Sequence, residues 1–239
     1  MAFGEKVYPG FLHDMFSSVP ERYDRVNRIL TWGQDQGWRK RAAADCLEDR
    51  PRWVLDLGCG TGDLAVLLSR RGGPEVKVVA LDFSLPMLEA ARAKAREAKL
   101  NVAFIRADAA HLPFRPGALD AAGSSFSLRN LTYRNPAAGQ HLAEAMRSLR
   151  PGGRWVMVET SQPPSAPVKW GFHSYLRYLV PPLGRLLSGN PGAYRYLAAS
   201  ALGFYPAEQV SRMLLGAGFR SVTFRRLFLG AVAIHTAIK

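Results

Sequence analysis

Three glycines at alternate positions, Gly58, Gly60 and Gly62, follow the apolar run of residues 53–57. Glycine tolerates positive φ and lets backbone N–H groups approach a ligand, so this spacing predicts a sharp turn from a strand into a helix whose N-terminus faces a cofactor. The dinucleotide fingerprint G-x-G-x-x-G places its third glycine one position later, and a Walker loop ends in Gly-Lys-Ser/Thr. NAD and nucleoside triphosphates therefore fit this turn poorly.

Acidic residues flank the glycine turn. Asp56 precedes the glycines and Asp63 follows them. Two carboxylates would repel an anionic pyrophosphate, whereas they suit a cofactor that carries positive charge. S-adenosylmethionine has both a sulfonium and an ammonium group, so these residues favour it. A glycine-rich connector that binds no ligand is the alternative.

The residues after the turn alternate between strand and helix patterns. The run 76–82 ends in Asp82, where a carboxylate can accept both hydroxyls of a ribose. This alternation predicts a parallel sheet with helices on both faces. The further predicted strands are 102–106, 119–126 and 154–159, and the predicted helices are 63–71, 84–99 and 136–149, the last ending in a turn at 150–153.

Two loops after the predicted strands carry polar side chains. In open α/β sheets ligands bind beyond the carboxyl ends of the strands. Asp108 could there accept a hydrogen bond from an adenine amino group, while the small Ala109 leaves room for the ring. The loop after the next strand contains Ser125, Arg129 and Asn130. A buried Arg129 would need an anion or a carbonyl as partner, so this loop is a second candidate site.

The remaining segments lie outside the alternating pattern. Residues 1–50 are predicted to be helical on the substrate side, with a basic Arg39-Lys40-Arg41, and 51–160 form the cofactor core. Residues 161–205 are aromatic and apolar with interspersed cations. This composition is typical of a lid over an apolar substrate, of a helix at a membrane surface, or of a helix packed on the sheet. Residues 206–239 predict a last helix and an antiparallel strand pair, and the 239 residues together suit one domain.

Charge and cysteine content narrow the partners. The net charge is +13, and residues 151–239 hold ten basic and two acidic residues. This asymmetry predicts an anionic partner, either nucleic acid or a membrane face, unless the charge serves solubility alone. Cys46 and Cys59 suit a reducing compartment, because a disulfide inside the glycine turn would obstruct the ligand. Without a signal-peptide pattern or an apolar span, we expect a cytoplasmic protein, soluble or peripheral on the membrane.

Four stretches make the sequence resemble the quinone C-methyltransferases that methylate demethylmenaquinone and 2-methoxy-6-polyprenylbenzoquinol. They are residues 15–27, with Tyr-Asp-x-x-Asn, 55–64, 126–130, with Phe-x-Leu-Arg-Asn, and 194–198. The similarity runs nearly end to end. It implies the class I methyltransferase fold, an α/β fold with a seven-stranded, mostly parallel, Rossmann-like sheet, and S-adenosylmethionine as the cofactor.

The resemblance also implies site residues. Tyr23 and Arg129 would face the quinol, and Arg129 would hold the phenolate oxygen that forms before a ring carbon takes the methyl group. Tyr23, Asp24 and an ordered water are the candidates for the proton acceptor. No metal site is expected. With the turn and its flanks, the expected cofactor-binding residues are Asp56, Gly58, Gly60, Thr61, Gly62, Asp82, Phe83, Asp108, Ala109 and Ser125.

Departures from the family pattern affect the substrate more than the reaction. Ser127 stands where the family usually has glycine, the stretch 159–163 differs, and so does the tail after His235. The expected reaction is C-methylation of a prenylated quinol in menaquinone biosynthesis, with the methoxybenzoquinol of the ubiquinone pathway as a second acceptor. We expect weak association with an anionic membrane, no nucleic acid, and a homo-oligomer as one option.

Alternative functions stay open at this stage. Another small phenol is one acceptor, and a non-catalytic cofactor-binding module is a further reading. The positive charge suggests an RNA methyltransferase. Residues 124–127 lack the Asn/Asp-Pro-Pro-aromatic motif of the amino-methylating enzymes, and neither Cys46 nor Cys59 is placed as the nucleophile of a cytosine C5 enzyme.

Overall fold

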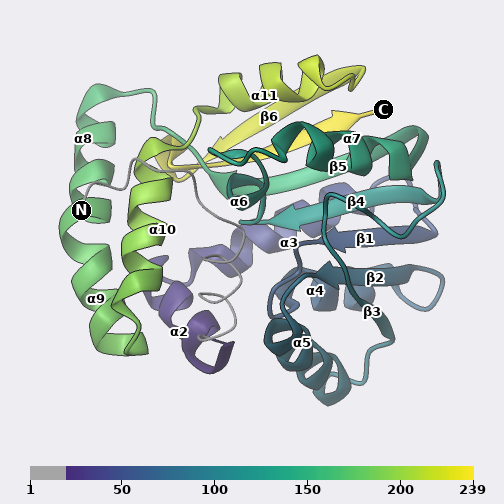
Figure 1. The fold of residues 1–239 in the computed structure, drawn as a ribbon, viewed down its shortest axis with the longest axis horizontal. Coiled ribbons are helices and arrows are strands. Elements are labelled where there is room, and N and C mark those ends of the chain that lie inside the picture. Colours follow the sequence, from purple (N-terminus) through teal and green to yellow (C-terminus); the bar gives the residue numbers. More distant parts are fainter. Residues whose placement is uncertain (1–19) are drawn as a thin grey trace.

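The strands of the protein form one twisted sheet (Figure 1). The computed structural model describes residues 20–239, with side chains from residue 24 onward. In that range the sheet order is β3-β2-β1-β4-β5-β7-β6; β1 to β5 run parallel, and β7 is antiparallel to both neighbours. This order confirms the predicted fold class. The strands are β1 (Trp53–Leu57), β2 (Lys77–Asp82), β3 (Val102–Arg106), β4 (Leu119–Ser125), β5 (Leu149–Thr160), β6 (Ser221–Leu227) and β7 (Val232–Ile238).

Helices cover both faces of the sheet and explain its hydrophobic patterning. Because both faces of the central strands are covered, β1 is an unbroken apolar run apart from Asp56, whereas the edge strand β6 alternates between exposed and partly buried positions. One apolar core includes Ala42, Leu68 and Leu88 from one set of helices, and the opposite core includes Leu142 and Leu214. The first set is α3 (Gln34–Cys46), α4 (Asp63–Gly72) and α5 (Leu85–Glu97); the second includes α6 (Leu128–Thr132), α7 (Ala138–Ser148) and α11 (Ala207–Gly216).

Strand β5 begins earlier than its sequence pattern indicates. The helix before it ends at Ser148, and the strand starts directly at Leu149, where a turn over 150–153 was expected. Gly152 has φ 73°, and the pairing with β4 shifts register between Leu119 and Ala121. The Pro-Gly-Gly signal therefore marks a bulge inside a strand, in which the extra residues loop out without ending the pairing.

The segment 161–205 packs against an N-terminal helix and forms a layer at the carboxyl ends of the parallel strands (Figure 1). We call this layer the helical cap. Its apolar interior is made by Val26, Leu30, Leu176, Val180 and Tyr194. The cap therefore has its own interior, and the idea of one helix packed on the sheet was wrong. It consists of α2 (Pro20–Leu30), α8 (Ala166–Ser174), the π-helical turn η1 (Tyr175–Leu179), α9 (Val180–Ser188) and α10 (Pro191–Gly203).

The helices of the described residues are too short or too polar to cross a bilayer. The assignment of the whole chain to one domain stays a prediction.

Candidate active site

A cavity of about 480 Å³ lies between the sheet and the helical cap. It opens where the strand order reverses between β1 and β4, which is the position at which open α/β sheets bind ligands. One end is lined by the glycine turn and the loops after β2 and β4, and the other by apolar side chains of the cap. Residues that the sequence analysis expected at the cofactor and that line this cavity are Gly58, Gly60, Thr61, Asp82, Phe83, Ala109 and Ser125.

The three glycines of the turn have different surroundings. All three have positive φ, at 70°, 52° and 80° for Gly58, Gly60 and Gly62. A Cβ on Gly58 would lie 2.7 Å from that of Ser127, and one on Gly62 would lie 2.8 Å from that of Ala91. A Cβ on Gly60 would meet nothing within 4 Å. Gly60 therefore leaves open space for a ligand, whereas Gly62, which does not line the cavity, lets α4 approach α5.

Asp82 ends β2 and fixes the glycine turn. Its carboxylate accepts the N–H groups of Gly60, at 2.8 Å, and of Ser84, at 2.9 Å. Burial raises the pKa of Asp82, although these N–H groups oppose the shift. Each carboxylate oxygen keeps a lone pair that can accept a further hydrogen bond, and the side chain lines the cavity. The open space at Gly60 beside this acceptor fits a cofactor with a ribose.

The two acids that flank the turn do not present unpaired charge to the cavity as expected, although Asp63 lines it. Asp56 is fully buried outside its wall, neither carboxylate oxygen has a hydrogen-bond partner, and burial raises its pKa to about 7. Asp63 forms ion pairs with Arg39 and Lys94, which lower its pKa although burial opposes them. The charge of Asp56 is thus suppressed by its raised pKa, and the charge of Asp63 is balanced by cations of the protein. Asp82, which lines the cavity, is then the carboxylate that would attract a cationic cofactor.

Asp108 also lies outside the wall of the cavity. Its side chain is 67% exposed, its Oδ1 accepts the N–H of Ala110 at 2.9 Å, and the same oxygen lies 3.7 Å from Nε2 of His141. The wall at this point is formed by Ala107 and Ala109. In this arrangement the small alanines, and not the carboxylate, would border a bound ring.

Arg129 is a buried cation in the middle of the site. It is the second residue of the short helix α6, is 3% exposed, and lines the cavity. Its Nη1 donates to Glu159 at 3.1 Å and to Thr160 at 2.6 Å, and Glu159 also accepts the Arg129 backbone N–H at 2.9 Å. The Nε of Arg129 is buried without a partner. Glu159 is thus the anion that a buried Arg129 needs, and the guanidinium keeps donors that neither Glu159 nor Thr160 occupies.

Asp24 connects α2 to the cofactor turn. Its carboxylate accepts from Oγ1 of Thr61 at 2.6 Å and pairs with Nζ of Lys94 at 2.7 Å. Asp24 does not line the cavity. The side chain of Tyr23 lies outside the described residues.

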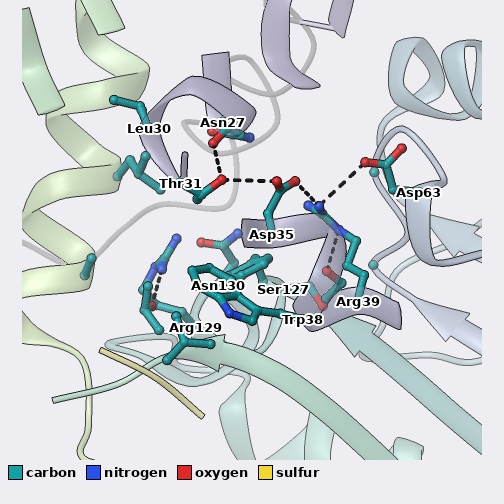
Figure 2. Close-up of a pocket in the computed structure, with 18 of the residues that line it drawn as sticks. Asn27, Leu30, Thr31, Asp35, Trp38, Arg39, Asp63, Ser127, Arg129 and Asn130 are labelled. Atoms are coloured by element: carbon teal, nitrogen blue, oxygen red, sulfur yellow. Dashed lines mark hydrogen bonds and ion pairs between the residues drawn. The ribbon is translucent and has the colours of Figure 1, made fainter. Parts of the chain in front are cut away.

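A polar chain that the sequence analysis missed crosses the cavity wall (Figure 2). Thr31 donates to Asp35 at 3.1 Å, Asp35 is paired with Arg39, and Nε of Arg39 donates to Ser125 at 3.0 Å. Asp35 is only 2% exposed and Arg39 8%. The spacing of an acid and a base four residues apart on one helix was the available signal, but it is also the pattern of an ordinary surface ion pair.

Other chemistries find no support in the described part of the chain. No group of three or more His, Cys, Asp or Glu side chains there could hold a metal ion. Cys46 and Cys59 are buried free thiols, and burial raises the pKa of each. Neither thiol is therefore prepared to act as a nucleophile.

The architecture matches that of solved methyltransferases. A SAM-dependent methyltransferase from Aquifex aeolicus superposes with a TM-score of 0.56 at 20% identity, covering 82% of this chain and 88% of its own. A possible histamine N-methyltransferase from Thermotoga maritima gives 0.62 at 16% identity, covering 95% and 99%. At such identities the likeness shows the fold alone. The fold and the place of the cavity are those of the class I methyltransferases.

The family follows from the sequence comparisons. The chain belongs to the ubiE/COQ5 methyltransferase family, whose sequence profile matches residues 4–239. A demethylmenaquinone methyltransferase of Thermus thermophilus is 44% identical over 92% of this chain and 98% of its own, and one of Deinococcus radiodurans is 41% identical over 95% and 92%. A protein of Desulfotalea psychrophila, named ubiquinone/menaquinone biosynthesis C-methyltransferase UbiE, is 38% identical over 97% and 91%.

Proposed function

We propose that this protein transfers the methyl group of S-adenosylmethionine to a ring carbon of demethylmenaquinol or a closely similar prenylated quinol. The observation that carries the proposal is the single cavity that joins the glycine turn, the buried Arg129 and the apolar interior of the cap. A ligand with a polar ring and a long apolar tail suits the second half of this cavity. The names of the relatives from Thermus and Deinococcus support the same acceptor.

The donor binds at the glycine-turn end. It supplies an electrophilic methyl group that needs a carbon nucleophile in line with it. Asp82 accepts the ribose hydroxyls, Gly60 leaves room for the cofactor beside the backbone, and Ala109 borders the base. Thr61, Phe83 and Ser125 complete this half of the wall. Asp56, Gly62 and Asp108 support the turn and the sheet edge from outside the cavity.

Arg129 orients the acceptor. A quinol carbon becomes nucleophilic when the neighbouring hydroxyl loses its proton, because the charge spreads onto the ring. The guanidinium of Arg129 lines the cavity and keeps N–H groups that can donate to that oxygen, while Glu159 and Thr160 hold it in place through Nη1. Asn130 follows in the chain, lines the same cavity, and accepts a hydrogen bond from Tyr196 at 3.0 Å.

The proton acceptor is Tyr23 or an ordered water. Asp24 was a third candidate, but its carboxylate is engaged by Thr61 and Lys94 and lies outside the cavity wall. Its part is to hold α2, and with it Tyr23, close to the glycine turn.

Labelled methyl transfer with a variant of Arg129 tests this assignment. Wild-type protein is incubated with labelled S-adenosylmethionine and, separately, short-tail demethylmenaquinol, a methoxybenzoquinol and tRNA. We expect label in the demethylmenaquinol. Arg129→Lys keeps the charge beside Glu159 but loses the forked donors, so turnover should fall about 100-fold or more while the Kd of S-adenosylhomocysteine changes little. Label in tRNA alone, or an equal loss of binding and turnover, would contradict the assignment.

Association with an anionic membrane completes the proposal. The chain carries no acidic residue from 160 to 207, and Lys169, Arg177, Arg185 and Arg195 are exposed there. Large apolar side chains of the cap are exposed beside them. Aromatic rings and cations on one surface favour the interface of an anionic bilayer, from which a prenyl tail could reach the cavity. The exposed apolar residues are Trp170, Tyr178, Leu179 and Leu186.

Vesicle sedimentation tests the membrane surface. We expect binding to vesicles that contain about one third anionic lipid, weaker binding to neutral vesicles, and release by salt. Trp170→Ser combined with Leu186→Ser should weaken the binding, whereas Leu215→Ser, at an exposed apolar position on α11, should not. Equal binding of all variants would exclude this surface.

A further inference from the structure

Five aromatic rings form a continuous line along the wall of the cavity. Their order is Phe126, Trp38, Phe228, Trp32 and Tyr175, and consecutive ring centroids lie 6.2, 5.9, 5.8 and 5.5 Å apart. All five side chains line the cavity. We call this line the aromatic track. Rings at such spacing and tilt contact one another and present one apolar, polarisable surface.

The track connects the cofactor end of the cavity with the molecular surface. Phe126 lies between Ser125 and Ser127, directly after β4, and Arg39 lies over its ring, 5.5 Å from the centroid. Trp38 is 6% exposed, whereas Phe228 is 45% and Trp32 65% exposed. A core cluster would bury its largest rings, so the outer half of the track is not explained by packing.

Backbone strain is concentrated on the same residues. In residues 20–239 seven non-glycine residues have positive φ, and four of them line the cavity. Three of these four are rings of the track: Phe126 at 57°, Phe228 at 47° and Trp32 at 49°. Bulky residues avoid this region because Cβ crowds the following carbonyl. Such strain persists where the surroundings enforce it and is concentrated at functional sites.

The hairpin between β6 and β7 also holds bulky residues at positive φ. Phe228, Leu229 and Gly230 at its tip have φ of 47°, 55° and 94°. A tight hairpin with positive φ is ordinarily built from Asn and Gly, which accept this conformation. Here two large apolar residues occupy it, and Leu229 is 76% exposed while it also borders the cavity. The tip therefore holds apolar side chains over the cavity opening at a conformational cost.

We propose that the aromatic track binds the flat face of the acceptor ring, guides it from the surface to the cofactor end, and favours a fused two-ring quinol over a single ring. This inference rests on the proposed function. A fused ring is wide enough to contact two consecutive rings of the track, whereas a single ring contacts one, and each offset or edge contact between aromatic rings adds to the apolar burial. The track is thus the part of the cavity that would distinguish the two-ring acceptor of the proposed function from a benzoquinol.

Glycine substitutions test the track because they remove the ring and relieve the strain at once. Phe228→Gly and Trp32→Gly should keep or raise Tm, since glycine accepts the existing φ. Both should raise the KM for short-tail demethylmenaquinol about tenfold and leave the Kd of S-adenosylhomocysteine unchanged. Phe228→Tyr should restore most of the lost affinity. Lys99→Gly is the matched control: Lys99 has φ 54°, is exposed and lies outside the cavity, so its Tm should change like that of the other two and its KM should not.

A binding measurement separates this inference from the proposed function. A 2-prenyl-1,4-naphthoquinone should quench the tryptophan fluorescence of the wild type, and a larger concentration should be needed in Trp32→Gly and Phe228→Gly. Wild-type binding without methyl transfer would overturn the proposed function alone. Equal affinity of the probe for the wild type and both glycine variants, or no binding to any of them, would overturn the track, as would an unchanged preference for the fused ring over a benzoquinone.

Discussion

Gly60 and Gly62 both need positive φ, but a side chain would meet different surroundings at the two positions. The Cβ of an alanine at Gly60 would project into open space at the cavity wall. The Cβ of an alanine at Gly62 would press against Ala91 on α5. Ligand binding and helix packing can therefore be separated by two otherwise identical substitutions.

Gly60→Ala should lower the affinity for S-adenosylhomocysteine by tenfold or more, at a stability cost of about 1–2 kcal/mol from the left-handed backbone. Gly62→Ala carries the same backbone cost and adds overpacking of about 1–3 kcal/mol. Calorimetric titration and urea unfolding of both variants provide the two readouts. A higher stability of Gly62→Ala than of Gly60→Ala, or normal ligand binding by Gly60→Ala, would contradict these two roles.

Asp56 makes the stability of the protein depend on pH. Its folded pKa of about 7 lies above the usual value of about 3.9, because burial disfavours the carboxylate. Between these values the folded protein holds a proton that the unfolded chain releases, so the free energy of unfolding falls as the pH rises from about 4 to 7. Asp56→Asn has no ionisable side chain at this position, so this fall in the free energy of unfolding is absent from the variant. Relative to the wild type, it should gain about 2–4 kcal/mol of stability between pH 5 and pH 8, measured by urea unfolding.

Asp120 provides the control for Asp56. Burial would raise its pKa, but the N–H groups of Trp53 and Arg52 and the guanidinium of Arg150 lower it. The stability that the Asp120 carboxylate contributes is therefore present above its unfolded pKa and is constant from pH 5 to pH 8. Asp120→Asn should lower stability by the same amount at both pH values. A pH-independent effect of Asp56→Asn would contradict the buried, protonated state of Asp56.

Helix α2 is held to the glycine turn by polar contacts as well as by the apolar interior of the cap. Lys94 on α5 pairs with Asp24 on α2 and with Asp63 at the start of α4. Asp63 is also paired with Arg39, so the removal of Lys94 leaves Asp24 without an ion-pair partner among the described side chains. Because α2 borders the cavity through Asn27 and Leu30, this attachment helps to order the side of the cavity that the helical cap forms.

Lys94→Met should loosen α2. The pair with Asp24 is partly exposed, so the loss of global stability should be about 1 kcal/mol or less. Amide hydrogen exchange over residues 20–30 should become faster, while that of β1 stays as in the wild type. Lys77→Met is a suitable control, because Lys77 lies over the ring of Trp53 and outside the cavity. Unchanged exchange in α2 would mean that the apolar contacts alone hold it.

The elements of the core could be read from sequence because their signals are local. Strands β1 and β3 have the predicted bounds, since each is an apolar run that ends at turn residues. The cap could not be placed in this way, because an aromatic stripe is the same whether it faces a core, a membrane or a cavity. The state of Asp63 depends on Arg39 and Lys94, which lie on other helices. The positive φ of Phe126 and Phe228 has no local sequence signal, since it opposes their backbone preference.

At the scale of the whole molecule, the segment that carries most of the positive charge also builds the side from which the cavity starts. The net charge of +13 is concentrated in the last third of the chain, and its acid-free stretch builds most of the cap. The cavity runs from this side to the cofactor end of the sheet. A lipid-like acceptor could thus leave a bilayer and reach the methyl donor without crossing bulk water.

The product of a single reaction shows whether the protein methylates a quinol at carbon. The protein is incubated anaerobically with S-adenosylmethionine that carries a 13C-labelled methyl group and with short-tail demethylmenaquinol, and the product is examined by NMR. We expect a labelled methyl group on the ring carbon next to the quinol oxygen. A labelled methoxy group, or no transfer to the quinol under conditions in which S-adenosylmethionine binds, would contradict this expectation.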